Sequence, residues 1–221
     1  KITGKNFFGS GFLSFVTGEE KVAPGNVVNS IEKLDVSQTA LDLKLGYNFT
    51  EFNNLKFWGG YHTDSGDPDR LDSKSEGYDS FFYEVYGQSG LMDLIRWGNL
   101  TFIRAGLSVD IFTGLTIGAE WLSMSKTEAG DNVNFGVAGR FFDANIPTNL
   151  VLGTDADLGN EFDLWIERKY QSGVNVRVTF ANFFPGGTFA NATGPGAAPL
   201  PSGNTPNSDI FQFLAQVGYF F

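Results

Sequence analysis

IFQFLAQVGYFF, residues 210–221, is a strand pattern with two different faces. Alternate positions from Phe211 to Phe221 are apolar or aromatic, whereas the positions between them include two glutamines and a glycine. Because side chains of a β-strand point alternately to opposite sides, this spacing predicts a strand with one apolar face and one mixed face. Tyr219 and Phe221 therefore share the apolar face at the end of the sequence.

A final strand of this kind resembles the closing strand of bacterial outer-membrane β-barrels, whose assembly machinery recognises a terminal aromatic residue. The resemblance implies that Tyr219 and Phe221 form an assembly signal and that the barrel-assembly machinery is a partner. Two alternatives are soluble: a β-sandwich, and a lipocalin-like barrel in which the same period carries its polar residues outside.

Composition narrows the function classes. The 221 residues contain no cysteine, which excludes a disulfide framework, thiol catalysis and a cysteine-based metal site. The net charge of −10 argues against nucleic acid as a partner, because phosphate binding needs clustered cations. No apolar run is long enough for a transmembrane helix, but a membrane-spanning strand needs only about 9–11 residues. The sequence opens without the apolar part of a signal peptide, so we expect a mature or an internal start.

Three hairpins with a period of two precede the final strand, and a weaker strand is expected over residues 5–18. Short turns join the arms of each hairpin, and long loops connect one hairpin to the next, as in outer-membrane barrels. The predicted arms are residues 41–49 and 55–62, 100–111 and 115–124, and 158–170 and 174–183; the predicted long loops are residues 19–37, 63–78, 125–156 and 184–209. Residues 79–99 lack clean alternation and fit a strand, a short helix or a loop folded into the lumen.

The pattern predicts an all-β fold, an antiparallel transmembrane β-barrel with about 8 strands in this chain. Two aromatic girdles are expected where the barrel meets the lipid interfaces. The expected periplasmic girdle is Tyr47, Phe49, Phe112, Tyr170, Tyr219 and Phe221, and the expected outer girdle is Tyr61, Trp121, Phe162, Phe183 and Phe184.

Two long segments resemble the alginate-export family of outer-membrane barrels. Residues 78–108, YDSFFYEVYGQSGLMDLIRWGNLTFIRAGLS, resemble that family's aromatic loop and the strand after it. Residues 157–187, DLGNEFDLWIERKYQSGVNVRVTFANFFPGG, resemble its acidic hairpin, which ends in Phe-Phe-Pro-Gly. The resemblance implies a porin-like channel. Family members have many more strands, so we expect residues 1–221 to be a single outer-membrane barrel domain or the C-terminal part of a longer barrel.

Charged residues gather on the polar faces of the predicted strands. They set the selectivity of a water-filled pore, or they fill a narrow, closed barrel as a structural ion-pair network. Opposite charges share these faces: Asp42 with Lys44, Arg104 with Asp110, and Glu161, Asp163, Glu167 and Lys169 beside Arg177. The candidate lumen and selectivity residues are Lys44, Lys56, Arg104, Asp110, Glu120, Glu161, Asp163, Glu167, Lys169 and Arg177.

No catalytic residue, metal or cofactor is predicted. Glu161 and Asp163 share one face of a strand, as a pair of acid–base carboxylates would, but no nucleophile motif accompanies them. His62, the single histidine, is predicted to be a solvated rim residue, because histidine metal sites usually need further ligands. Aspartates between positions 64 and 72 predict a solvated acidic loop, with a Ca²⁺ site as the alternative.

The sequence therefore predicts a porin-like channel in the bacterial outer membrane for passive passage of hydrophilic or anionic solutes, and not an enzyme. The alternative is a structural or interaction barrel with a plugged lumen, which associates with other envelope protein chains. Outer-membrane lipid and lipopolysaccharide are the further expected partners, the latter bridged by divalent ions to the acidic loops.

Overall fold

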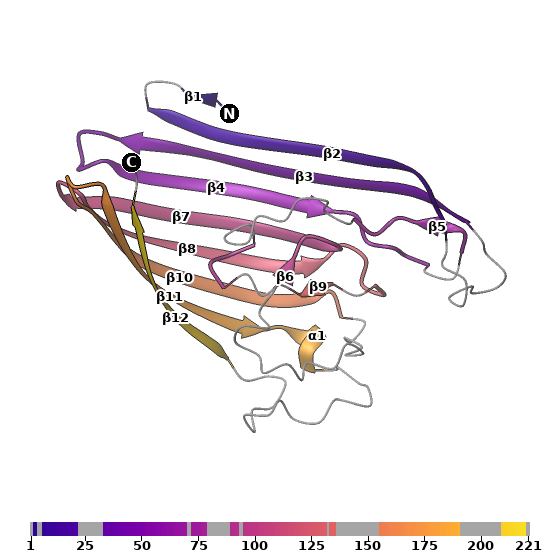
Figure 1. Ribbon diagram of the computed structural model, residues 1–221. Coiled ribbons are helices and arrows are strands. Elements are labelled where there is room, and N and C mark those ends of the chain that lie inside the picture. The colour runs from indigo at the N-terminus through magenta and orange to yellow at the C-terminus, as the bar shows by residue number, and fades with distance from the viewer. Residues whose placement is uncertain are drawn as a thin grey trace.

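The computed structural model describes residues 2–3, 6–21, 33–69, 72–78, 89–92, 95–131, 133–135, 155–190 and 209–219. Its dominant feature is one antiparallel sheet of long strands (Figure 1). The long strands are β2 (Phe7–Lys21), β3 (Lys33–Phe49), β4 (Leu55–Asp64), β7 (Leu100–Phe112), β8 (Leu115–Lys126), β10 (Asp157–Lys169), β11 (Val174–Pro185) and β12 (Ile210–Tyr219). The short elements are β1 (Ile2–Thr3), β5 (Lys74–Ser75), β6 (Ile95–Arg96), β9 (Asn134–Phe135) and a single helical turn, α1 (Gly187–Ala190).

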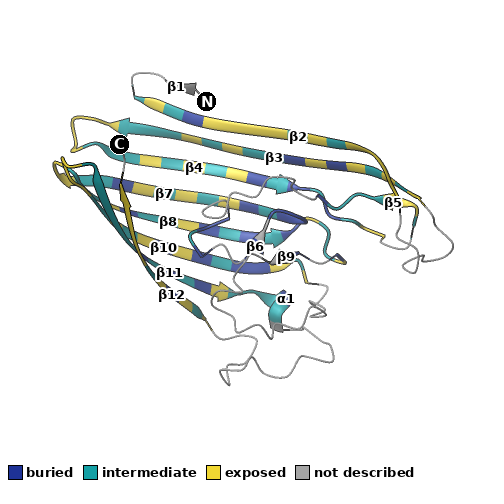
Figure 2. Cartoon of the chain, viewed as in Figure 1, coloured by how far each residue is buried: buried dark blue, intermediate teal, exposed yellow. Residues whose placement is uncertain are grey.

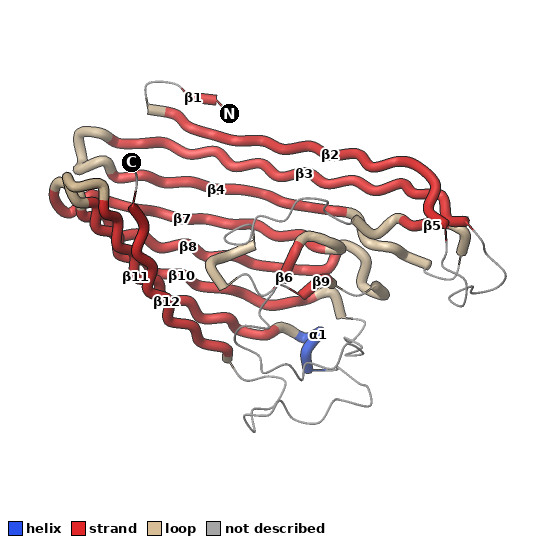
Figure 3. Tube along the Cα trace, viewed as in Figure 1, coloured by secondary structure: helices blue, strands red, loops and turns tan. Residues whose placement is uncertain are grey.

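The main sheet follows the order of the chain. Its strands pair as β1-β2-β3-β4-β7-β8-β10-β11-β12, and β5 adds a parallel pairing to β3. This is the up-and-down antiparallel arrangement of a barrel wall, so the predicted all-β fold class is confirmed. The sheet curves strongly, as Figure 3 shows, and among the described residues no pairing joins β12 to β1 or β2. The described sheet is therefore an open section of barrel wall.

Connections differ between the two ends of the strands. Tight turns join β3 to β4, β7 to β8 and β10 to β11 at one end, where Gly114 and Gly173 adopt positive φ angles of 78° and 86°. Only glycine enters that region without steric cost, which is why these connections can be so short. The long connections all leave from the opposite end (Figure 1).

One face of the sheet is apolar and open to the surroundings. Burial alternates along parts of β3, β7 and β10 in Figure 2, as the period of two requires, whereas most of β2 is exposed. Leu45 is 66% exposed and Val217 is 76% exposed, although exposure of large apolar side chains to water is unfavourable. Such side chains recur on this face at Phe57, Ile103, Leu107, Ile117, Trp121, Phe162, Leu164 and Phe213. A continuous apolar band of this kind is typical of a surface that faces lipid.

The aromatic girdle at the tight-turn end matches its prediction in part. Tyr47, Phe49 and Phe57 contact one another edge to face at this end of β3 and β4. Phe112, Tyr170 and Tyr219 are 60%, 50% and 56% exposed, while Phe221 lies outside the described residues. At the other end Phe183 contradicts the prediction. It is 1% exposed and packs on Phe189 of α1, because it lies on the polar face of β11, in register with Glu161.

Several predicted loops are partly strand. β2 and β3 continue to the pair Lys21↔Lys33, inside the predicted loop 19–37, and Lys33 bonds Glu19 at 2.8 Å across them. β4 likewise takes Thr63 and Asp64 from the predicted loop 63–78. Polar residues can continue a strand pair beyond the apolar band, so hydrophobic alternation alone placed these ends too early.

The apolar band gives a first testable prediction. Leu164 lies on β10 between the aromatic positions Tyr170 and Phe184, and it is 40% exposed. If this face meets lipid, Leu164→Arg lowers the free energy of unfolding by about 2–4 kcal/mol, because arginine is costly near the bilayer midplane. Urea titration of the protein in lipid vesicles measures this change. Glu51→Arg in the β3–β4 turn is the control. Equal, small effects of both variants would show that the face does not contact lipid.

Candidate functional site

An inner segment, residues 89–92 and 95–99, lies across the polar face of the sheet (Figure 1). At its first end the backbone N–H of Leu91 donates to Asp163 Oδ2 at 3.0 Å, and the N–H of Met92 donates to Glu161 Oε1 at 2.8 Å. Both carboxylates are fully buried. Gly90 makes this contact possible, because its φ is +102° and a Cβ there would overlap the Glu161 carboxylate. Glu161 and Asp163 thus hold the segment on β10.

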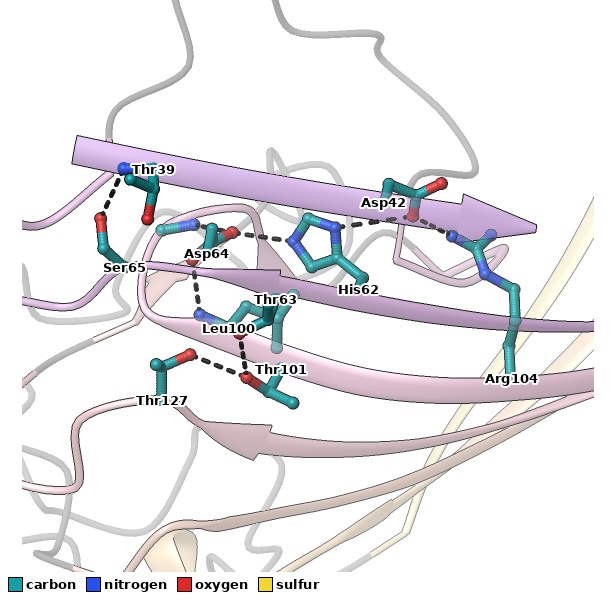
Figure 4. A network of polar contacts seen from close by, with 11 residues as sticks. Thr39, Asp42, His62, Thr63, Asp64, Ser65, Leu100, Thr101, Arg104 and Thr127 are labelled. Carbon is teal, nitrogen blue, oxygen red and sulfur yellow. Dashed lines mark hydrogen bonds and ion pairs between the residues drawn. The ribbon is translucent and has the colours of Figure 1, made fainter. Parts of the chain in front are cut away.

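The second attachment is Asp64, at the end of β4 (Figure 4). Its carboxylate accepts the N–H of Gly98 at 2.9 Å and the N–H of Leu100 at 2.7 Å. The same carboxylate lies 2.9 Å from His62 Nε2. A buried carboxylate with three polar partners is well satisfied, so Asp64 fixes where the inner segment joins β7.

His62 is buried, which contradicts its prediction as a solvated rim residue. Its side chain has no exposed surface and lies between two rings, Trp97 at 4.2 Å and Phe102 at 4.7 Å between ring centroids. The inner segment supplies Trp97 and covers the imidazole, a contact that strand periodicity does not reveal. His62 Nδ1 is 3.5 Å from Asp42, and Arg104 donates to the same carboxylate at 2.7 Å (Figure 4).

Next to this network a cavity of about 460 Å³ opens on the polar face. Side chains from all eight long strands and from the inner segment form its walls. They are Phe8, Lys44, Lys56, Trp58, Leu91, Arg104, Glu120, Trp165, Arg177, Thr179, Leu214 and Gln216. Four of these side chains are basic and one is acidic, so positive groups outnumber negative ones in the lining although the whole chain is acidic.

Two tryptophans of the cavity lie against glycines of neighbouring strands. Trp58 pairs in register with Gly106, and Trp165 pairs with Gly118. A Cβ at either glycine would overlap the indole ring, so both rings rest on bare backbone. The ring centroids are 5.9 Å apart, and Trp58 Nε1 donates to Glu120. This aromatic wall was not among the predicted site residues, although both tryptophans fall on polar faces of their strands.

The cavity cations differ in how they are neutralised. Lys44 Nζ lies 3.7 Å from Glu120, and Arg104 is paired with Asp42. Of the opposite charges expected to gather, Asp42 and Lys44 attract each other electrostatically, whereas the closest partners of Arg104 and Asp110 are other residues. The observed partners lie on different strands, and Asp110 instead accepts from Asn54 and Thr116 at the tight turns.

The structure separates the predicted lumen residues into three groups, all on the polar face. Lys44, Lys56, Arg104, Glu120 and Arg177 meet around the cavity. Glu161 and Asp163 lie beneath the inner segment, and their hydrogen bonds give them a structural role. Asp110, Glu167 and Lys169 lie towards the tight-turn end, where Glu167 accepts from Asn175 at 2.7 Å and contacts Lys169 at 3.4 Å.

The described part of the chain contains neither a metal-binding cluster nor a membrane-spanning helix. There, no group of three or more histidine, cysteine, aspartate or glutamate side chains is placed to hold a metal ion. In the acidic loop, Asp131 accepts the N–H of Asp67 at 2.8 Å. None of the described helices has the length and hydrophobicity needed to cross a bilayer.

A curved antiparallel sheet with an exposed apolar face and a charged, hollowed opposite face defines the wall of a membrane-embedded β-barrel. Comparison with protein families agrees with this class. The family model described as alginate export matches residues 18–198, and the chain belongs to this family. It is a transport family of outer-membrane export and porin-like proteins, not an enzyme family. A search of curated proteins found no significant match.

Proposed function

We propose that the chain forms the wall of an outer-membrane channel for passive passage of hydrophilic and anionic solutes. The observation that carries the proposal is the cavity on the polar face, where four basic side chains surround one carboxylate. Fixed charges of one sign raise the local concentration of the opposite ion and set the selectivity of a pore. No covalent chemistry is needed for this role.

The surroundings of the barrel are part of the same proposal. The apolar face contacts outer-membrane lipid, and the acidic loops approach lipopolysaccharide through divalent ions. Tyr219, the last residue of β12, and Phe221, two positions later in the sequence, are recognised by the barrel-assembly machinery. The exposure of Tyr219, Phe213 and Phe211 along one side of β12 supports this recognition.

Ion selectivity tests the channel. In a planar bilayer with a salt gradient, the reversal potential of the wild-type protein is expected to show anion preference. Replacing both Lys56 and Arg177 by glutamate shifts the cation-to-anion permeability ratio by about tenfold, because a unit charge about 4 Å from an ion contributes about 1 kcal/mol even in water. Lys74→Glu, at an exposed site outside the cavity, is the control and leaves the ratio nearly unchanged.

One observation favours a different role. The inner segment is hydrogen-bonded to the sheet at both of its ends, as a plug in a barrel lumen would be. A barrel that inserts correctly but conducts no ions would support the alternative, an interaction barrel that associates with other envelope proteins. Unchanged selectivity of a conducting double variant would instead remove Lys56 and Arg177 from the selectivity site.

A further inference from the structure

The cavity combines cations with an apolar lining, which a site for fully hydrophilic solutes does not require. Its apolar and aromatic walls are Phe8, Trp58, Leu91, Trp165 and Leu214. We propose that the cavity binds an aromatic carboxylate of the benzoate class, with the carboxylate held by Arg177 and Lys56 and the ring against the tryptophan wall. This inference deepens the proposed function and rests on it, because it names the class of anion that the channel retains.

Arg177 is the main anchor for the carboxylate. Its guanidinium lies over the Trp165 ring, 5.1 Å from the centroid, and its Nε is buried without a hydrogen-bond partner. Glu167 lies directly opposite Arg177 in the strand register. Its carboxylate instead accepts a hydrogen bond from Asn175 and forms a salt bridge with Lys169. Among the described residues no carboxylate oxygen therefore forms a salt bridge with Arg177, although the Asp163 carboxylate attracts its charge from farther away. A buried, unpaired donor is costly, and a bound anion would remove that cost.

Lys56 provides the second positive charge. It lines the same cavity, and no ion pair with a described residue neutralises it. Lys44 and Arg104 differ, since Lys44 forms a salt bridge with Glu120 and Arg104 forms one with Asp42. Lys56 and Arg177 are thus the two lining cations without a salt bridge to a described residue, which matches one carboxylate group better than a string of charges.

The ring is recognised by the flat wall and by aliphatic side chains. Trp58 and Trp165 rest on Gly106 and Gly118, so their rings line the wall side by side at an interplanar angle of 38°. Aromatic rings favour offset or edge contacts with such a wall. Leu91 and Leu214 add surface that cannot hydrogen-bond. Hydroxyl groups of a sugar ring set against these apolar side chains would lack partners, and only Thr179 and Gln216 on β11 and β12 would offer neutral polar groups to them, whereas an aromatic ring needs none.

Calorimetric titration of the detergent-solubilised protein tests the site, with benzoate as the probe. We expect saturable binding of benzoate, with binding of benzamide, acetate and glucuronate weaker by about tenfold, because each lacks the charge, the ring or the apolar surface. Equal affinity for acetate would show a site for charge alone. Glucuronate binding as tightly as benzoate would show a saccharide site. Either result would overturn the proposal.

Two variants separate the contributions of charge and ring. Arg177→Gln keeps a polar side chain of similar length and is expected to weaken benzoate binding by about tenfold. Trp165→Leu is expected to weaken benzoate more than acetate, and Lys74→Gln is the control with unchanged affinity. Unaltered benzoate affinity in folded Arg177→Gln would reject the assigned anchor. Anion-selective conductance without benzoate binding would refute this inference alone, while benzoate binding without conductance would refute the channel.

Discussion

Asp64→Ala is expected to lower the free energy of unfolding by roughly 3–6 kcal/mol, the largest stability loss among the changes considered for this protein. The substitution removes the acceptor of two backbone N–H groups, those of Gly98 and Leu100, and the partner of the His62 imidazole. All three groups stay buried, and each unpaired group costs about 1–3 kcal/mol. Urea-induced unfolding in lipid vesicles, followed by tryptophan fluorescence, measures the change.

Two further variants show whether this loss of stability comes from the hydrogen bonds of the Asp64 carboxylate. Asp64→Asn keeps one oxygen acceptor and should lose less stability than Asp64→Ala. Asp35→Ala removes an exposed carboxylate from neighbouring strand β3 and should change the free energy of unfolding little. If Asp64→Ala were as stable as Asp35→Ala, the second attachment of the inner segment would not contribute to the folded state.

Gly90→Ala is expected to release the first end of the inner segment. An alanine at φ +102° is strained by roughly 1–3 kcal/mol, and its Cβ would overlap the Glu161 carboxylate. The hydrogen bonds from Leu91 and Met92 to Asp163 and Glu161 should then open more often. Amide hydrogen exchange at these two N–H groups is expected to become about tenfold to hundredfold faster, because exchange reports the local opening equilibrium.

Gly130 provides the matched control for this substitution. A Cβ at Gly130 meets nothing within 4 Å, so Gly130→Ala should leave exchange at Leu91 and Met92 unchanged. If Gly90→Ala also left these rates unchanged, the carboxylates of β10 would not be what holds the segment. Faster exchange together with a larger single-channel conductance would show that the segment narrows the conducting path.

The hairpins of this chain could be predicted from the sequence because their signal is local. Residues 41–49 and 158–170 alternate with a period of two, and the turns after them contain the expected polar residues. Side-chain direction follows from the same period. All ten predicted lumen residues consequently fall on one face of the sheet, although their role in selectivity stays a prediction.

Contacts between distant segments could not be predicted in this way. Arg104 pairs with Asp42 because β4 lies between β3 and β7 and brings the two side chains within reach of each other. The sequence pattern of β7 alone suggests Asp110, which lies on the same face of that strand. His62 looks solvated by sequence, since only the return of the chain at Trp97 covers it. The close backbone approach at Gly90 could have been predicted from the sequence. Glycine in an aromatic stretch is a candidate for a positive φ and a close backbone approach.

The rings that rest on glycines tie the evolution of neighbouring strands together. Trp165 fills the space that a side chain at position 118 would need, and Trp58 does the same for position 106; Phe8 repeats the arrangement over Gly46. A larger residue at one of these glycines fits only if the ring opposite becomes smaller. Substitutions at a ring position and at its glycine are therefore expected to be coupled, so that the two positions act as one unit of the barrel interior.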